Sequence, residues 1–270
     1  MASTGQFILT LTFYLVRLAL IIVLTVVLAT VTVLAGLIDP HGKIVYPINK
    51  IWTWAILFAG GVKLHVTGLE KLDAQRPYVF MVNHQSNIDI PILVKSLPDF
   101  QLRWIAKREL LWVPFFGWAL WAGKHITVDR NRPSAAVKSL RRAKERIAAG
   151  ISVVVFPEGT RSRDGALQRF KKGGFLLAIE TQTDVVPVTI VGSRNLLPSG
   201  AWRLRSGAVE VIIDQPIAIA GWRPGNLRLL MNQVRATIAA RLHPAATVSG
   251  TEEAAPPLFR QHILAHQHTA

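Results

Sequence analysis

The hydrophobic positions divide the chain into an apolar N-terminal region, a body of mixed pattern and a polar tail. Residues 7–38 are almost wholly apolar, with one charge at Arg17. Residues 18–38 alone supply about the 20 residues that a helix needs to cross a ~30 Å hydrocarbon core. A signal peptide fits poorly, because no Lys or Arg precedes Phe7 and the apolar run is too long. We therefore expect residues 1–62 to form a membrane-embedded helical element.

Two modes of membrane insertion fit this region. A second apolar stretch, residues 51–62, carries Trp52 and Trp54, and tryptophan favours the headgroup level. The region is either a transmembrane anchor or a pair of helices that enters one leaflet, with its turn at residues 39–42. Arg17 favours the pair, because an arginine in the middle of a bilayer is costly. A buried helix of a soluble protein is the alternative to both.

Residues 63–243 have the pattern of a single α/β domain. Short apolar runs predict strands over residues 79–82, 104–106, 126–128, 152–156, 185–191 and 209–213. The stretches between them predict helices over residues 89–96, 133–149, 173–182 and 226–242. Alternating strands and helices indicate a mixed, largely parallel sheet flanked by helices. Residues 244–270 are rich in Ala, Thr, Pro, Glu and His, which predicts a disordered tail rather than a metal site.

Charge and cysteine content narrow the possible partners. The chain has 31 Lys and Arg against 16 Asp and Glu, a formal net charge of +15. This balance indicates an anionic partner, and the apolar N-terminus favours a membrane over nucleic acid. The Lys and Arg that follow residue 43 predict that the catalytic part lies on the cytoplasmic side of a membrane, which is the inner or plasma membrane if the protein is bacterial. The chain has no Cys, which excludes disulfides, thiolate catalysis and Cys-ligated metals.

The clearest candidate chemistry follows the predicted strand 79–82, in the sequence Asn-His-Gln-Ser-Asn-Ile-Asp. A tight turn would bring the carboxylate of Asp89 to Nδ1 of His84. That contact sets the tautomer and leaves Nε2 able to take a proton. No nucleophilic serine is needed, because a substrate can supply the hydroxyl. In an alternative interpretation, Asp89 caps a helix and His84 is a buried hydrogen-bonding residue. The spacing of the two residues favours neither interpretation over the other.

A second candidate segment, Phe-Pro-Glu-Gly-Thr-Arg-Ser, lies at the end of the predicted strand 152–156. The carboxyl ends of strands are where α/β sheets usually bind ligands. Gly159 permits a tight turn, and the planar fork of Arg161 suits a phosphate. Residues 171–174, Lys-Lys-Gly-Gly, add charge and exposed backbone donors. The alternative is a basic surface loop.

Two further positions accompany predicted strands. Arg130 follows the strand 126–128 and would reach the same end of the sheet, unless it only pairs with Asp129. Pro187 interrupts the apolar strand 185–191, which marks a sheet edge, a bulge or a ligand-lining wall.

In their order along the chain, these segments resemble the 1-acylglycerol-3-phosphate (lysophosphatidic acid) acyltransferase family of glycerolipid acyltransferases. Its Asn-His-Gln-Ser motif, followed by Asp, is matched by residues 83–89, and its Phe-Pro-Glu-Gly-Thr-Arg-Ser motif by residues 156–162. A further family motif, a Gly followed by apolar residues and an acid-Arg pair, is matched loosely by residues 123–130, where the Gly-to-Arg spacing is long and the usual aromatic is absent. Another, around a Pro in a strand, is matched by residues 186–188. The resemblance covers roughly residues 65–215.

The resemblance implies an activity and a set of roles in phospholipid biosynthesis. His84 is the implied general base, which takes the proton from the sn-2 hydroxyl of lysophosphatidic acid. That hydroxyl attacks the thioester of acyl-CoA or acyl-carrier protein and yields phosphatidic acid. Asp89 is implied to orient His84 and to stabilise its cation. Membrane lipids are the expected partners, and no cofactor, metal or covalent enzyme intermediate is implied. The implied acceptor-binding residues are Arg130, Glu158, Gly159, Thr160 and Arg161.

Other functions stay open. Within acyl transfer, the acceptor could be lyso-ornithine lipid or lysophosphatidylcholine; the fork of Arg161 favours a phosphate monoester. A non-catalytic membrane protein that binds anionic lipid or nucleic acid is a second class, against which the intact His84 and Asp89 argue. A serine hydrolase is disfavoured, because residues 63–243 contain no Gly-x-Ser-x-Gly.

Overall fold

The computed structural model describes residues 4–129, 133–162, 164–201 and 203–242. The predicted substrate-binding residue Arg130 and the predicted tail, residues 244–270, lie outside the described residues.

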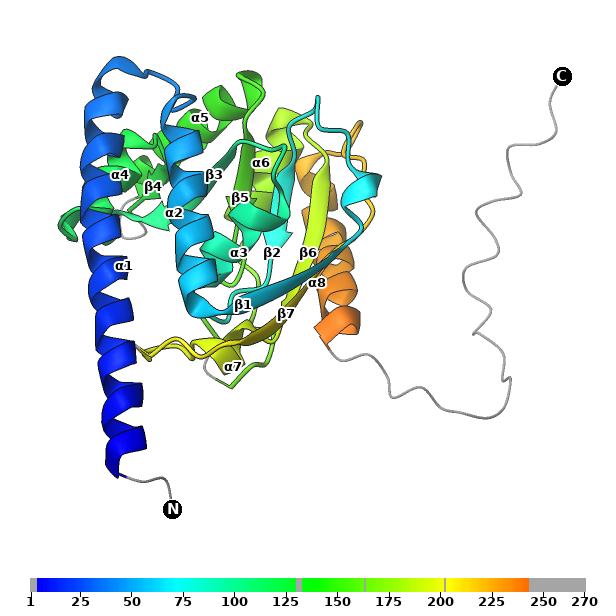
Figure 1. Ribbon diagram of the computed structural model, residues 1–270. Coiled ribbons are helices and arrows are strands. Elements are labelled where there is room, and N and C mark those ends of the chain that lie inside the picture. Colours follow the sequence, from blue (N-terminus) through cyan, green and yellow to red (C-terminus); the bar gives the residue numbers. More distant parts are fainter. Residues whose placement is uncertain (1–3, 130–132, 163, 202, 243–270) are drawn as a thin grey trace, which may run out of the picture.

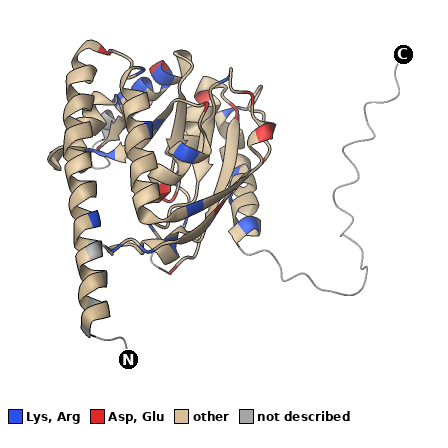
Figure 2. Ribbon diagram, in the orientation of Figure 1, with Lys and Arg blue, Asp and Glu red and all other residues tan. Residues whose placement is uncertain are grey.

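The N-terminal region is a pair of helices. Helix α1 (Thr4–Ile38) runs along one side of the molecule, and α2 (Val45–Gly60) packs between it and the sheet (Figure 1). The buried carboxylate of Asp39 orders the turn between them, because it accepts the N–H groups of Ile44 and Val45 at 2.6 and 3.1 Å. The segment Leu15–Ile38 is long and apolar enough to cross a membrane. Figure 2 shows that α1 carries almost no charge, in contrast to the body.

The body is built on one sheet. Within the described residues it has seven strands, in the order β1-β7-β6-β2-β5-β3-β4. The pairs are parallel except for β6 with β7, which confirms the predicted mixed, largely parallel sheet. The strands are β1 (Val62–Thr67), β2 (Val79–Val82), β3 (Leu102–Lys107), β4 (Ile126–Val128), β5 (Ser152–Val155), β6 (Val185–Val191) and β7 (Gly207–Ile213).

Helices cover both faces of this sheet (Figure 1). On one face, α2 and α3 contribute to a core with the inward side chains of the strands; on the other, α5, α6 and α8 do so. Because β2 and β5 are buried on both faces, their sequences are continuous apolar runs, as expected for central parallel strands. The remaining helices are α3 (Asp89–Ser96), α4 (Phe116–Ala122), α5 (Pro133–Ala148), α6 (Gly173–Thr181), α7 (Ser193–Leu196) and α8 (Leu227–Leu242), with short 3-10 turns at Leu69–Lys71, Arg108–Trp112 and Pro224–Asn226.

The structure contains three elements that the sequence did not predict, strand β1 and helices α4 and α7. Strand β1 was not predicted, because it is an edge strand whose Lys63 and His65 are exposed and interrupt the apolar pattern. Of the three alternatives for Pro187, the sheet edge is wrong, since β6 lies between β7 and β2, while the bulge and the ligand-lining wall stay predictions. The antiparallel ladder with β7 begins only at Val188, so the missing N–H of Pro187 leaves no gap in it. The carbonyl of Pro187 still accepts the N–H of Asp214 at 3.0 Å.

Candidate active site

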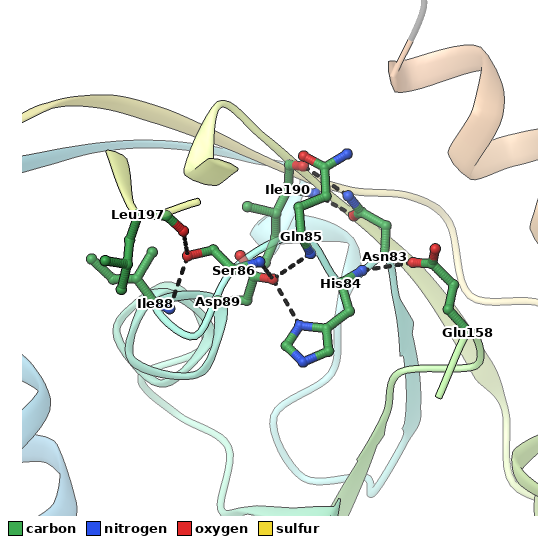
Figure 3. A network of polar contacts seen from close by, with 9 residues as sticks. All are labelled: Asn83, His84, Gln85, Ser86, Ile88, Asp89, Glu158, Ile190 and Leu197. Carbon is green, nitrogen blue, oxygen red and sulfur yellow. Dashed lines mark hydrogen bonds and ion pairs between the residues drawn. The ribbon is translucent and has the colours of Figure 1, made fainter. Parts of the chain in front are cut away.

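The two residues of the predicted catalytic pair meet in the loop between β2 and α3. His84 Nδ1 lies 2.9 Å from Asp89 Oδ2, and the ring's Nε2 points away from the carboxylate (Figure 3). The same oxygen accepts the backbone N–H groups of Gln85 and Ser86, each at 2.8 Å. Asp89 is 0% exposed. Since a carboxylate only accepts hydrogen bonds, the proton of a neutral imidazole lies on Nδ1 and Nε2 is the free acceptor.

The other side chains of this motif hold the loop to the rest of the body (Figure 3). The amide of Asn83 donates to the carbonyl of Ile190 and accepts its N–H, at 2.9 and 2.8 Å, as a neighbouring strand would. The hydroxyl of Ser86 donates to the carbonyl of Leu197 at 2.6 Å. The position of His84 therefore depends on contacts to β6 and to the segment that follows it.

The second candidate segment, residues 156–162, reaches the same place through Glu158, and we call it the second motif. Its Oε1 accepts the backbone N–H of His84 at 2.8 Å, and its Oε2 accepts that of Gln168 at 2.9 Å. The N–H of Ser162 donates to the carbonyl of His84 at 2.8 Å. Glu158 is 3% exposed, and burial raises the pKa of its carboxyl group. Both carboxylate oxygens are thus engaged with the backbone, so Glu158 braces the two loops; a contact between Glu158 and substrate stays a prediction.

The residues after Glu158 turn outward. Gly159 has a φ of +73°, and a Cβ there would lie 2.9 Å from Cε and Nζ of Lys171. The positive φ therefore favours glycine, whereas the end of the Lys171 side chain is flexible and can move away from a Cβ. Thr160 is exposed and Arg161 is half-buried. In the part of the chain that the structure describes, no carboxylate forms an ion pair with Arg161, which leaves its charge available for an anionic group.

An aromatic stack covers the catalytic imidazole, a feature that the sequence reasoning did not predict. The ring of Phe156 lies parallel to that of His84, with centroids 3.9 Å apart, and Trp104 stacks beyond it at 6.2 Å. Phe156 belongs to the second motif, so a signal was present, but nothing in the sequence indicated what the ring would contact. The stack restrains the plane of the imidazole and excludes water from one of its faces.

A mostly apolar cavity of about 550 Å³ adjoins the second motif. Pro157, Gly159 and Lys171 form its border on the side of the site. We call it the apolar cavity; its walls come from β3, β4, β5, α5 and α6 and include Ile105, Ile126, Leu140, Ala143, Val155 and Leu177. Ligand sites of roughly 300–1,000 Å³ are typically lined in this way, mostly by apolar groups with a few polar ones. The cavity therefore has the size and character of a site for an alkyl chain.

Comparison with known proteins places this arrangement in a family. The sequence model described as Acyltransferase matches residues 63–191. A chloroplastic 1-acyl-sn-glycerol-3-phosphate acyltransferase of Arabidopsis thaliana is 36% identical over 206 residues, which are 75% of this chain and 56% of that protein. The alpha form from Ovis aries is 32% identical, over 70% of this chain and 66% of that protein. The chain belongs to this acyltransferase family.

The fold agrees with this membership. The crystal structure of the 1-acyl-sn-glycerophosphate (LPA) acyltransferase PlsC from Thermotoga maritima has a TM-score of 0.72 and 26% sequence identity to the chain. The match covers 88% of this chain and 96% of that one. The chain spans 49% to 61% of the length of the first three curated relatives that it matches. The family model itself covers residues 63–191, and the roles of individual site residues stay predictions.

Proposed function

We propose that the protein transfers a fatty acyl group from a thioester donor to the sn-2 hydroxyl of lysophosphatidic acid and so forms phosphatidic acid. The observation that carries this proposal is the 2.9 Å contact between His84 Nδ1 and Asp89 Oδ2, which leaves Nε2 as a free base. Glu158 of the second motif accepts the backbone N–H of His84, and this contact places the motif beside the base. The relatives' names, which specify 1-acyl-sn-glycerol-3-phosphate, support the choice of acceptor. So does the charge of Arg161, which pairs with no carboxylate of the described residues.

The proposed reaction is a direct transfer. Nε2 of His84 takes the proton of the sn-2 hydroxyl while that oxygen attacks the thioester carbonyl carbon. The tetrahedral intermediate then breaks its carbon–sulfur bond, and the imidazolium returns the proton to the thiolate. The buried carboxylate of Asp89 stabilises the imidazolium between these steps. General-base catalysis of this kind typically contributes roughly 10² to 10⁴ in rate, and it needs no cofactor because the nucleophile belongs to the substrate.

The proposed substrate contacts follow from charge and apolarity. Arg161 holds the phosphate of the acceptor in a forked contact, and Arg130 adds a second cation. Gly159 and Thr160 supply backbone and hydroxyl groups at the same turn. The acyl chain of the donor enters the apolar cavity, whose border at Pro157 is shared with the second motif.

The N-terminal helices bring this site to its lipid substrate. Most apolar side chains described on α1 are exposed, and burying them in lipid is favourable by about 25 cal/mol per Å². We propose that α1 and α2 hold the catalytic body at the cytoplasmic surface, where the acceptor arrives from the bilayer and the donor from water. The basic surface adds attraction to anionic headgroups, by about 1 kcal/mol for each nearby Lys or Arg.

The test is an assay of the full chain in detergent, with palmitoyl-CoA and palmitoyl-carrier protein against a panel of lysolipids. We expect acylation of lysophosphatidic acid, and a loss of at least 100-fold in kcat for His84→Ala. His65→Ala, at an exposed position on β1, is the matched control and should retain full activity. Preferential acylation of lyso-ornithine lipid or lysophosphatidylcholine would refute the choice of acceptor. Full activity of His84→Ala would refute the mechanism.

A further inference from the structure

A second cavity, of about 700 Å³, lies between the segment that follows the second motif and the first half of α8. Its lining includes Arg169, Lys172, Arg228 and Arg235, and no Asp or Glu of the described residues contributes to it. We call it the basic cavity. The first three side chains are exposed, and within the described residues none of them forms an ion pair. Four cations around one hollow, with no carboxylate among the described lining residues, make a site for a polyanion.

One wall of the basic cavity is held in place by the protein itself. Arg235 donates to the carbonyl of Leu167 at 2.9 Å and to that of Gln168. Its guanidinium lies 5.5 Å from the ring centroid of Phe170, which is only 5% exposed. The N–H of Gln168 in turn donates to Glu158. The basic cavity is therefore linked through two short contacts to the carboxylate that braces the catalytic histidine.

The basic cavity and the apolar cavity share a wall. Within residues 169–174, Arg169, Phe170 and Lys172 line the basic cavity, whereas Lys171, Gly173 and Gly174 line the apolar one. The N–H of Lys171 donates to the carbonyl of Pro157 at 2.7 Å, which places this wall against the second motif. An apolar chamber and a cationic chamber thus meet beside the proposed reaction centre.

We propose that the basic cavity binds the 3′-phospho-ADP portion of a coenzyme A thioester, while the acyl chain occupies the apolar cavity. This inference rests on the proposed function. A coenzyme A thioester has an apolar chain at one end, a polyanionic nucleotide at the other and the reactive carbonyl between them. The two cavities adjoin each other along residues 169–174, next to the second motif, so one molecule with these two ends can occupy both. Arginine forks and guanidinium faces suit phosphates and a base.

The shape of the site favours a nucleotide over a carrier protein. A hollow of about 700 Å³ is within the range of small-molecule sites, roughly 300–1,000 Å³. A folded carrier protein instead needs a face of about 800 Å² on each partner, and much of a concave wall would stay out of its reach.

The decisive experiment compares donors that differ only in the nucleotide. Palmitoyl-CoA, palmitoyl-dephospho-CoA, which lacks the 3′-phosphate, and palmitoyl-pantetheine are each assayed with lysophosphatidic acid and the full chain. We expect kcat/KM to fall about tenfold without the 3′-phosphate, the loss typical of one charge-assisted contact. Arg228→Gln and Lys172→Gln should each raise KM for palmitoyl-CoA about tenfold, leave kcat unchanged and leave palmitoyl-pantetheine unaffected. Lys138→Gln, at an exposed position on α5, removes the same charge elsewhere and should change none of these values.

Three results would overturn the proposal. They are equal use of CoA and dephospho-CoA thioesters, an equal loss with palmitoyl-pantetheine in the two variants, and an effect of the variants on palmitoyl-carrier protein alone. If the unmodified chain acylates no lysophosphatidic acid, the proposed function fails instead. The basic cavity is then judged by binding: adenosine 3′,5′-bisphosphate should raise the Tm of the unmodified chain but not that of Arg228→Gln, and an equal response of both refutes the site.

Discussion

The exchange of Asp89 for asparagine isolates one contribution to the proposed mechanism. One carboxylate oxygen of Asp89 accepts three hydrogen bonds, from His84 Nδ1 and the N–H groups of Gln85 and Ser86. The other oxygen is buried and has no hydrogen-bond partner among the described residues. An asparagine can place its carbonyl oxygen at the first position and its NH₂ group at the second. Asp89→Asn should therefore keep the geometry of the loop and remove only the charge.

The size of the effect follows from that geometry. Two unit charges about 4 Å apart attract each other by about 4 kcal/mol at an effective dielectric of 20. We expect half or more of this stabilisation of the imidazolium to be lost, about 2 to 4 kcal/mol, which lowers kcat by roughly 30- to 1,000-fold. In a serine-protease triad the same exchange costs roughly 10⁴, because the asparagine favours the wrong histidine tautomer. Here two backbone N–H groups fix the amide oxygen, so the tautomer of His84 is preserved and the loss is smaller.

Asp89→Ala provides the contrast. It removes the acceptor of two buried N–H groups, and each unsatisfied donor costs about 1–3 kcal/mol of unfolding free energy. Thermal unfolding in detergent should therefore show Asp89→Ala to be clearly less stable than Asp89→Asn, and single-turnover acyl transfer gives the chemical step for both. An Asp89→Asn protein with undiminished kcat, or two variants of equal stability, would show that the reasoning from this geometry is wrong.

Three further predictions concern other contacts. Glu158 accepts the backbone N–H groups of His84 and Gln168, and Glu158→Gln would set its amide NH₂ against one of these donors. We expect the variant to lose about 1–3 kcal/mol of unfolding free energy and at least tenfold in kcat, measured by thermal unfolding and by initial rates. A variant with unchanged stability and kcat would refute the bracing role of Glu158. Burial, reinforced by two nearby arginines, lowers the pKa of His125 to about 3. A histidine in the unfolded chain has a pKa of about 6.5. His125 therefore costs no folding free energy above pH 6.5, and below that pH the folded protein loses stability, by about 2 kcal/mol at pH 5. The dependence of Tm on pH should be flatter for His125→Asn, and equal slopes contradict this assignment. Ala143→Phe fills part of the apolar cavity and should shift donor preference toward shorter acyl chains in a competition assay, whereas an unchanged chain-length profile would place the donor chain elsewhere.

Local sequence patterns predicted most of the fold because the elements that carry it are regular. The strands 79–82, 126–128 and 185–191 were predicted with the bounds that the structure gives them. These strands are buried or half-buried and consist mostly of apolar residues. Edge strand β1 has no continuous apolar run. The error over Pro187 has the same origin, since the pattern of one strand does not reveal where the ladder with its neighbour begins.

The amino-acid sequence by itself determined the apolar N-terminus, the order of the motifs and the pair His84 and Asp89. The two residues are five positions apart, and one turn suffices to join them. Only the tertiary structure decided that Glu158, 74 positions from His84, holds the backbone of that residue. It also decided that Phe156 covers the imidazole and that residues 169–172 and α8 enclose the basic cavity. Contacts of this second kind join backbone amides and ring faces from distant segments, so they exist only once the sheet and its helices have packed together.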